Sequence, residues 1–356
     1  MSTPRRRWWL ALLVPVLLLG AACGDDGGSD EASGDGGETS ADVPSLRLGY
    51  FPNLTHAPAL VGVEQGLFED ALEGEAELET STFNAGPEAV EALFADALDA
   101  TFIGPNPAIN AYAQSDGAAI RIISGSTSGG AYLVVREGID TPEDLAGTTL
   151  ASPQLGNTQD VALRSWLKDE GYETDEAGGG DVSIEPQANG EALAAFVAGD
   201  VDGAWVPEPW ATRMIQEGSG HVLVDEADLW PGGEYVTTHL IVRTEYLEDN
   251  PEAVKALLEG TADAIDAAND DPGAAKEAAN AQLEELTDAP LDTEVLDAAW
   301  ENLTFTADPI ASSLQQGAED AEAVGLLDPV DLEGIYDLGP LNEVLEGRGQ
   351  TAVEEL

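Results

Sequence analysis

Apolar and polar positions follow two different periods along residues 46–345, and the two periods alternate along the chain. Runs with a period of two predict strands, and runs with apolar residues three or four positions apart predict amphipathic helices. Strands are predicted at residues 46–51, 76–82, 100–103, 120–124, 131–135 and 236–242. Helices are predicted at residues 57–68, 87–98 and 158–169, from a start at 141–144, and throughout 251–345, where Asp-Pro pairs at 271, 308 and 328 divide them. Strands alternating with helices predict parallel sheets that helices cover on both faces.

One pattern of helix, turn, strand and proline-framed turn occurs twice in the chain. The first copy spans residues 89–107 and frames Asn106 between prolines, and the second spans 192–209 and frames Glu208. Two related units predict two lobes, and a cleft between lobes is a usual place for a small ligand.

The order of the elements predicts an α/β protein of two lobes. One lobe is expected to comprise residues 45–133 plus 237–356, and the other residues 134–236. A chain of 356 residues is long enough for two units of ordinary size. Two strands then cross between the lobes, which predicts a hinge.

Residues 1–22 have the pattern of an export signal. Three arginines at 5–7 precede an apolar segment at 8–19, which is too short to span about 30 Å of hydrocarbon. The only cysteine, Cys23, follows directly, as in the lipobox of bacterial lipoproteins, and is expected to carry lipid. Gly20 stands where a lipobox usually has leucine, so a soluble secreted protein cut nearby is the alternative.

The segment 23–44 and the overall composition are strongly acidic. After Cys23 this segment consists mainly of Gly, Ser, Asp and Glu, which predicts a disordered tether. The whole chain has 69 acidic and 13 basic residues, a formal net charge of -56, and 43% hydrophobic residues. Repulsion from phosphates excludes nucleic acid as a partner. Acids spread over the predicted helix faces are most simply a solvated surface.

Four segments stand where a predicted strand ends and a helix begins, the edge at which parallel sheets bind ligands. They are residues 53–56, 104–107, 156–160 and 207–210, and the loop 126–130 adds hydroxyls and glycines. Each helix N-terminus stabilises a nearby negative charge by about 0.3 to 1 kcal/mol. Several directed at one cleft predict an oxyanion site that needs no lysine. Taken singly, each segment is also explained by ordinary helix capping.

Two acidic residues qualify the prediction of an anion site. Asp160 and Arg164 lie four positions apart on a predicted helix, and an i,i+4 ion pair explains them. Glu208 has no such partner nearby in the sequence. If Glu208 faces the cleft, the ligand carries a hydrogen-bond donor or a positive charge beside any anionic group, and Glu208 limits which solute binds.

Five motifs together resemble the substrate-binding proteins of ABC importers for nitrate, sulfonate and bicarbonate, nearest to the branch named for aliphatic sulfonates. The motifs are FPNLTHA at 51–57, IGPNPA at 103–108, SGG at 128–130, GNTQDVALR at 156–164 and WVPEPW at 205–210. The resemblance implies a two-lobed periplasmic-binding-protein fold of type II, with two strand crossovers. The ligand-binding residues that it implies are Asn53, Thr55, His56, Asn106, Ser128, Gly129, Asn157, Thr158, Gln159, Trp205 and Glu208.

The same resemblance implies a function. The protein is expected to be an extracytoplasmic solute-binding lipoprotein that closes on a small organic oxyanion, best an aliphatic sulfonate, and delivers it to a membrane permease with its ATPase. It is expected to be a monomer at the outer face of the bacterial cytoplasmic membrane, held only by lipid on Cys23, with no cofactor and no metal. Related proteins bind taurine, nitrate, aromatic acids, riboflavin or thiamine-precursor pyrimidines, and these remain alternative ligands.

Two other classes of protein are alternatives. The superfamily includes pyrimidine-synthesising enzymes with a pyridoxal-phosphate lysine, but Lys168, Lys255 and Lys276 lie on predicted helix bodies and not in cleft loops. The sequence also has no Gly-x-Ser-x-Gly elbow, no metal-spaced His or Cys cluster and no P-loop. We therefore expect no enzyme. A surface lipoprotein that kept the fold without transport is the other alternative.

Overall fold

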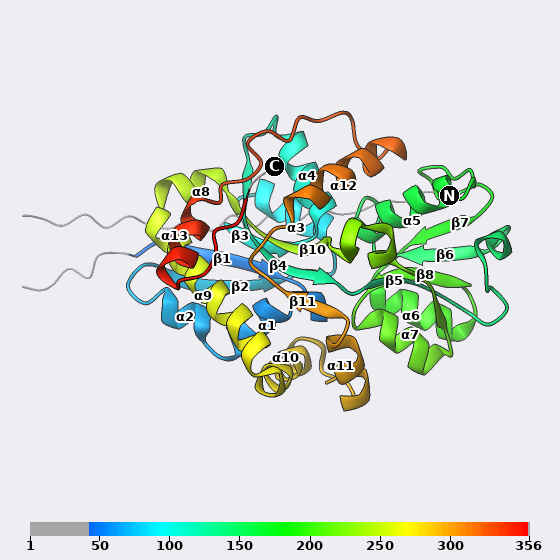
Figure 1. The fold of residues 1–356 in the computed structure, drawn as a ribbon, viewed down its shortest axis with the longest axis horizontal. Coiled ribbons are helices and arrows are strands. Elements are labelled where there is room, and N and C mark those ends of the chain that lie inside the picture. The colour runs from blue at the N-terminus through cyan, green and yellow to red at the C-terminus, as the bar shows by residue number, and fades with distance from the viewer. Residues whose placement is uncertain (1–42, 355–356) are drawn as a thin grey trace, which may run out of the picture. The chain divides into compact units, whose positions relative to one another are not determined.

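The computed structural model describes residues 43–354, and these residues build two β-sheets with helices around them (Figure 1). The predicted export signal, Cys23 and all but the end of the predicted tether lie outside the described residues. Within residues 43–354, no helix has both the length and the apolar character needed to span a membrane.

The first sheet has six strands in the order β11-β4-β10-β3-β1-β2. β1 pairs in parallel with β2 and β3, whereas β10 runs antiparallel to β3 and β4, and β11 runs antiparallel to β4. The strands are β1 (Ser45–Tyr50), β2 (Glu77–Thr82), β3 (Ala100–Ile103), β4 (Ile120–Gly129), β10 (Val236–Arg243) and β11 (Leu303–Phe305).

The second sheet has five strands in the order β7-β6-β8-β5-β9. β6 is parallel to β7 and β8, and β5 is antiparallel to β8 and β9. Both sheets are therefore mixed, and the prediction of parallel sheets holds only for the pairs of β1 with β2 and β3 and of β6 with β7 and β8. Parallel neighbours need a long crossover connection, usually an α-helix. The chain enters β5 from the first sheet, and β10 from the second sheet, with no α-helix before the strand, and both strands run antiparallel to their neighbours. The strands are β5 (Ala131–Val135), β6 (Thr149–Ser152), β7 (Ser183–Pro186), β8 (Gly203–Pro207) and β9 (His221–Asp225).

Helices cover both faces of the second sheet, with α5 on one face and α6 and α7 on the other (Figure 1). The predicted helix 158–169 is confirmed, whereas the predicted helix 57–68 is interrupted, because Gly66 adopts a left-handed φ of 70°. The predicted helix start at 141–144 is a single 3-10 turn. The α-helices are α1 (Ala57–Glu64), α2 (Leu67–Ala71), α3 (Gly86–Phe94), α4 (Pro105–Gln114), α5 (Thr158–Asp169), α6 (Asn189–Ala198), α7 (Trp210–Gly218), α8 (Thr244–Asp249), α9 (Pro251–Asp270), α10 (Pro272–Thr287), α11 (Thr293–Trp300), α12 (Ala311–Ala323) and α13 (Gly339–Gly347). The 3-10 helices are η1 (Leu54–His56), η2 (Pro142–Leu145), η3 (Glu226–Leu229) and η4 (Pro231–Gly233).

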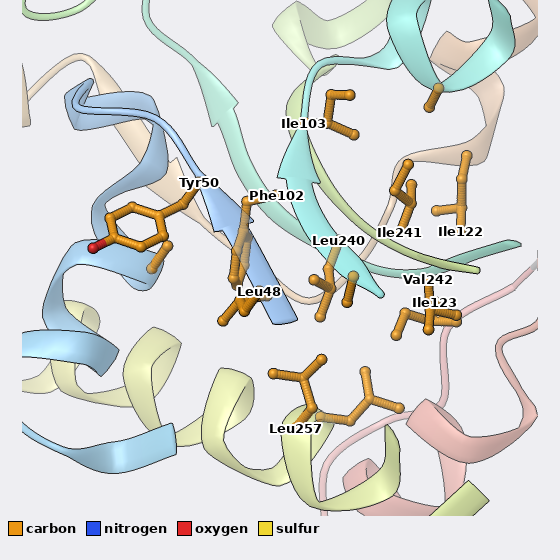
Figure 2. Packing of buried hydrophobic residues seen from close by; sticks show 14 of the residues in the cluster. Leu48, Tyr50, Phe102, Ile103, Ile122, Ile123, Leu240, Ile241, Val242 and Leu257 are labelled. Carbon is orange, nitrogen blue, oxygen red and sulfur yellow. The ribbon is translucent and has the colours of Figure 1, made fainter. Parts of the chain in front are cut away.

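Each sheet has its own hydrophobic core. In the first, Leu257 of α9 packs under the sheet near Leu48 and Leu240 (Figure 2). In the second, Leu133 belongs to a cluster on one face and Val134 to a cluster on the other, as the alternation of side chains along a strand requires. Burying a leucine side chain fully stabilises the fold by about 1.5 to 3 kcal/mol, so each sheet is stabilised by its own helices.

The two passages of the chain between the sheets are hydrogen-bonded to each other. Gly129 and Gly130, with φ of 81° and 74°, lead from β4 to β5. The Thr237 hydroxyl on the returning strand donates to the Gly129 carbonyl at 2.6 Å, and the Ala131 amide donates to the Tyr235 hydroxyl at 3.2 Å. Two adjoining connections of this kind are a typical hinge for lobes that close on a ligand.

Candidate functional site

A small polar cavity, the inner cavity, lies where the carboxyl ends of β1, β3 and β8 approach one another. Its volume is about 20 Å³, close to what one water molecule needs. It is bounded by residues from both sheets and the loops that follow their strands. The lining residues are Phe51, Asn53, Thr55, His56, Asn84, Gly104, Asn157, Thr158, Gln159, Asn189, Pro207 and Thr237.

The lining of the inner cavity is polar and uncharged. Among the described residues that line it there is no Asp, Glu, Lys or Arg, and His56 is the one titratable side chain. Burial lowers the pKa of His56 to about 3, so its imidazole is neutral at physiological pH. The ring is stacked on Phe51, with 4.4 Å between the centroids. No group of three or more His, Cys, Asp or Glu in residues 43–354 is placed to hold a metal ion.

Four helices start at the inner cavity. Thr55 and His56 precede α1, Gly104 is the N-cap of α4, Thr158 begins α5 and Asn189 begins α6. At α5 the N-cap side chain is that of Asn157, whose Oδ1 accepts from the Thr158 amide at 2.9 Å. Because helix N-termini carry positive partial charge and unpaired N–H groups, the cavity favours an anion although it contains no cation.

Three buried polar atoms of the lining have no hydrogen-bond partner in the protein. They are His56 Nδ1, Thr158 Oγ1 and Asn189 Oδ1. An unpaired buried polar atom costs about 1 to 3 kcal/mol, so such atoms indicate where a ligand binds. Half a turn of the Asn189 amide exchanges its acceptor for a donor, so all three side chains can present hydrogen to an anion once the histidine tautomer is chosen.

Gly104 brings the two sides of the inner cavity into contact. A Cβ atom on Gly104 would lie 2.4 Å from Thr158 Oγ1, inside any allowed separation. Gly104 follows β3 of the first sheet, and Thr158 begins α5 beside the second. The backbone at Gly104 has a φ of -70°, which every residue can adopt. Glycine is therefore required here by the close approach, and not by the backbone conformation.

Asp160 holds the loop before α5 in place. Its carboxylate accepts from the Ser152 hydroxyl at 2.6 Å, the Gly156 amide at 2.9 Å and Arg164 Nε at 3.0 Å. The predicted i,i+4 pair with Arg164 is thus confirmed, but both side chains are buried. A buried pair of this kind depends on complete hydrogen bonding, and here that bonding fixes the loop that carries Asn157 and Thr158.

The structure gathers six of the eleven predicted ligand residues around the inner cavity. They are Asn53, Thr55, His56, Asn157, Thr158 and Gln159. Three lining residues that the sequence reasoning did not name are Asn84, Asn189 and Thr237. Asn84 follows β2, a predicted strand, so the rule applied to the other loops, a polar residue between a strand and a helix, would have found it. Asn189 follows β7, which the sequence did not predict, so the same rule would have missed it.

Asn106, Ser128 and Gly129, three predicted residues of the first lobe, lie outside the lining of the inner cavity. The Asn106 amide donates to the carbonyl of Gly317 on α12 at 2.9 Å. Ser128 and Gly129 belong to β4 and pair with β10 and β11. These residues hold the fold together around the cavity.

The other two predicted residues, Trp205 and Glu208, are also turned away from the inner cavity. Trp205 is fully buried in the second core, and its Nε1 donates to Glu226 at 2.7 Å. Glu208 accepts from the Thr212 hydroxyl at 2.8 Å and from Asn302 Nδ2 at 2.7 Å, and burial raises its pKa. Glu208 therefore bonds to a residue of the other lobe and does not line the inner cavity, and its predicted effect on the choice of ligand stays a prediction.

Two sheets joined by paired chain passages, with a polar cavity at their facing edges, define the class of two-lobed periplasmic-binding-protein folds. The chain shares this fold with the alkanesulfonate-binding protein from Xanthomonas axonopodis pv. citri bound to MOPS. The TM-score is 0.69 at 20% identity, and the match covers 84% of this chain and 100% of that one. The predicted fold class is confirmed.

The sequence pattern of the NMT1-like family matches residues 39–283, and the chain belongs to this family. The taurine-binding periplasmic protein from Escherichia coli (strain K12) is 29% identical over 58% of this chain and 62% of that protein. A putative aliphatic sulfonates-binding protein from Bacillus subtilis (strain 168) is 29% identical over 65% of this chain and 66% of that protein. The chain thus matches just under two thirds of the length of these relatives.

These relatives place the chain among binding proteins and not among enzymes. The resemblance found in the motifs, to the substrate-binding proteins of the sulfonate, taurine, nitrate and bicarbonate group, is confirmed by the family match and by the relatives.

Proposed function

We propose that this protein is the extracytoplasmic solute-binding component of an ABC importer, and that its ligand is a small organic oxyanion, best an aliphatic sulfonate. The observation that carries the proposal is the inner cavity itself, which combines four helix N-termini with a lining of uncharged polar side chains. The names of the relatives, which are binding proteins for taurine and aliphatic sulfonates, support the same class of ligand.

The electrostatics of the chain favour an oxyanion held by local donors. A formal net charge of -56 repels anions at long range, so the affinity has to come from hydrogen bonds at short range. A cationic or zwitterionic solute would place its ammonium group beside amide and hydroxyl oxygens only, because the lining offers no carboxylate. An alkanesulfonate without an amino group therefore suits the cavity better than taurine does, because taurine adds an ammonium group to its sulfonate.

Closure of the two lobes is the mechanism that we propose for capture. The units of the motion are the two predicted lobes, except that residues 131–133 move with the second lobe, because they belong to β5 of the second sheet. The paired passages at Gly129 and Thr237 are the hinge. The contact of Gly104 with Thr158 then forms only when the lobes meet. A ligand that binds both sides of the cavity stabilises the closed state by its differential affinity, and that state is presented to the permease and its ATPase.

A thermal-shift screen of the full chain, purified in detergent, tests the ligand class. The compounds are methanesulfonate, butanesulfonate, taurine, nitrate, bicarbonate, phthalate, riboflavin and a pyrimidine. A ligand at a hundred times its Kd stabilises the folded state by about 2.7 kcal/mol, which raises the Tm by several degrees. We expect the largest shift with a sulfonate. A clear shift with a neutral or cationic compound, and none with any sulfonate, would contradict the proposal.

We also propose that Cys23 is lipidated and anchors the protein to the outer face of the cytoplasmic membrane. The support is the position of the single cysteine directly after an export signal. Mass spectrometry of the N-terminal peptide tests it, with Cys23→Ser as the control. A wild-type N-terminal peptide without added acyl mass, and a protein found in the medium in both cases, would contradict the anchor.

A further inference from the structure

A second and larger cavity, the outer pocket, adjoins the inner cavity. Its volume is about 280 Å³. Much of its wall is apolar, formed by Pro52 and Trp210 together with Leu283, Leu291 and Val295. The pocket lies between α7 on one side and the end of α10 and the start of α11 on the other. It thus combines an apolar wall with a position next to a polar site.

The wall between the two cavities consists of Pro52 and the indole of Trp210. Residues 51–53 alternate across it, because Phe51 and Asn53 line the inner cavity and Pro52 lines the outer pocket. Trp210 Nε1 donates to Asn53 Oδ1 at 2.7 Å. The far edge of the indole faces Gly190, where a Cβ atom would lie 3.6 Å from the ring. Gly190 directly follows Asn189, another residue of the inner cavity.

Several contacts fix the orientation of the Trp210 indole. Besides the bond to Asn53, the Arg213 guanidinium lies 5.0 Å from the centre of the ring, in a cation–π arrangement. Arg213 is held in turn by Glu217 at 2.7 Å. Asn53 follows β1 of the first sheet, whereas Trp210 begins α7 beside the second. The wall is therefore assembled from both lobes and is complete only when they meet.

We infer that Trp210 is a specificity-determining residue that limits the length of the solute. This inference rests on the proposed function and names the solute class more narrowly, as an oxyanion whose tail is too short to extend past Trp210. A head group held at the N-termini of α5 and α6 directs a longer tail toward Trp210. Without the indole, such a tail enters the outer pocket, which Arg213, Glu217 and Asp292 line beside the apolar residues. Each methylene buried against the apolar wall raises the affinity about fourfold.

Isothermal titration of the full chain with methanesulfonate, butanesulfonate and octanesulfonate tests the inference. In the wild type we expect affinity to fall as the chain lengthens. In Trp210→Ala we expect the affinity for octanesulfonate, relative to methanesulfonate, to rise at least tenfold over the wild-type ratio. Trp210→Phe keeps a ring but loses the bond to Asn53, and we expect it to keep the wild-type order. If Trp210→Ala does not fold, Trp210→Leu is measured with the same series.

The outcomes separate this inference from the proposed function. A wild type that binds methanesulfonate, with the same length dependence in Trp210→Ala as in the wild type, overturns the role of Trp210 and leaves the sulfonate proposal in place. A wild type that binds octanesulfonate as tightly as methanesulfonate overturns the role as well. If no sulfonate binds the wild type, the proposed ligand class fails and the inference fails with it.

Discussion

The two copies of the repeated pattern, residues 89–107 and 192–209, build matching parts of the two lobes, but their proline-framed residues do not line the inner cavity. In each copy the end of the strand, at Gly104 or Pro207, lines the inner cavity. The residue framed by prolines turns away in both, Asn106 toward Gly317 and Glu208 toward Thr212. The comparison teaches that the repeat supplies a scaffold, and that neighbouring loops supply most of the side chains that line the inner cavity.

The copies also differ in their cores. Phe102 of the first copy and Trp205 of the second hold corresponding positions, and both are fully buried. An indole brings an N–H group that needs an acceptor, and Trp205 finds it in the buried carboxylate of Glu226 at 2.7 Å. The larger aromatic in the second copy therefore comes with a buried acid that the first copy does not need.

The largest expected effect is at the end of the first copy. Gly104→Val places a side chain 2.4 Å from Thr158 Oγ1, which keeps the lobes from closing. Overpacking costs up to about 3 kcal/mol, so we expect a loss of about a hundredfold in calorimetric affinity for the solute found in the screen. Circular dichroism should be unchanged. The control is Gly190→Ala, whose new Cβ would lie 3.6 Å from the Trp210 ring, an ordinary contact, and which should keep the wild-type affinity. If Gly104→Val binds the solute with wild-type affinity, the close contact between Gly104 and Thr158 is refuted.

The second prediction concerns Glu226, the buried acid that accepts from Trp205 of the second copy. Burial raises the pKa of Glu226 from 4.5 to about 7, against hydrogen bonds from Trp205 and Trp230 that lower it. The folded state thus binds this proton more tightly than the unfolded chain, so the contribution to stability is complete below about pH 4.5 and is lost as the pH rises through about 7. Between these pH values the free energy of unfolding of the wild type should fall by up to about 3 kcal/mol relative to that of Glu226→Gln.

Chemical denaturation at pH 5 and pH 8 measures this difference in the free energy of unfolding. Glu91→Gln, an exposed position in the first copy, serves as the matched control and should follow the wild type at both pH values. If the free energy of unfolding changes equally with pH in the wild type and in Glu226→Gln, the buried acid beside the second copy does not make stability depend on pH.

A smaller effect is expected at Thr158, which lies outside the repeat but directly against Gly104. Thr158→Val keeps the shape of the side chain and removes the hydroxyl that has no partner in the protein. A hydrogen bond to a charged group contributes about 1.5 to 3 kcal/mol, so affinity should fall at least about tenfold. Thr261→Val, a buried hydroxyl within α9, should leave it unchanged. Equal affinities of the two variants would remove Thr158 from the site.

The smallest effect is expected at the proline-framed residue of the first copy. Asn106→Ala leaves the Gly317 carbonyl without its 2.9 Å partner, which should lower the free energy of unfolding by about 1 to 2 kcal/mol. Solute affinity should stay within about threefold of the wild type, because the side chain does not line the cavity. A tenfold loss of affinity at unchanged stability would return Asn106 to the ligand and break the comparison.

Local periodicity predicted much of the fold. The strands at 100–103 and 131–135 and the helix at 158–169 have the predicted ends. β6, β7, β9 and β11 were not predicted, because they are three to five residues long, and β7, β9 and β11 are also partly exposed. Short strands of this kind are stabilised by pairing with distant partners, which a local pattern does not report.

The part of the candidate site that follows from neighbouring residues in the sequence was predictable. A polar residue between a strand and a helix identified Asn53, Thr55, Asn157 and Thr158, and all of them line the inner cavity. Trp205 was misleading because a motif does not show to which side of its strand a residue points. Its neighbours Ala204 and Val206 belong to the cluster on the opposite face of the second sheet.

The sequence by itself determined the class of protein, the internal repeat and a cleft built on helix N-termini, because these depend on periodicity and on motifs that are contiguous in the chain. Only the tertiary structure decided which motif residues line the inner cavity. Asn106, Glu208 and Trp205 are satisfied by Gly317, Asn302 and Glu226, which lie 211, 94 and 21 positions away in the sequence. A buried polar side chain points to whichever partner the fold brings within hydrogen-bond distance, and that partner is set by packing between distant segments.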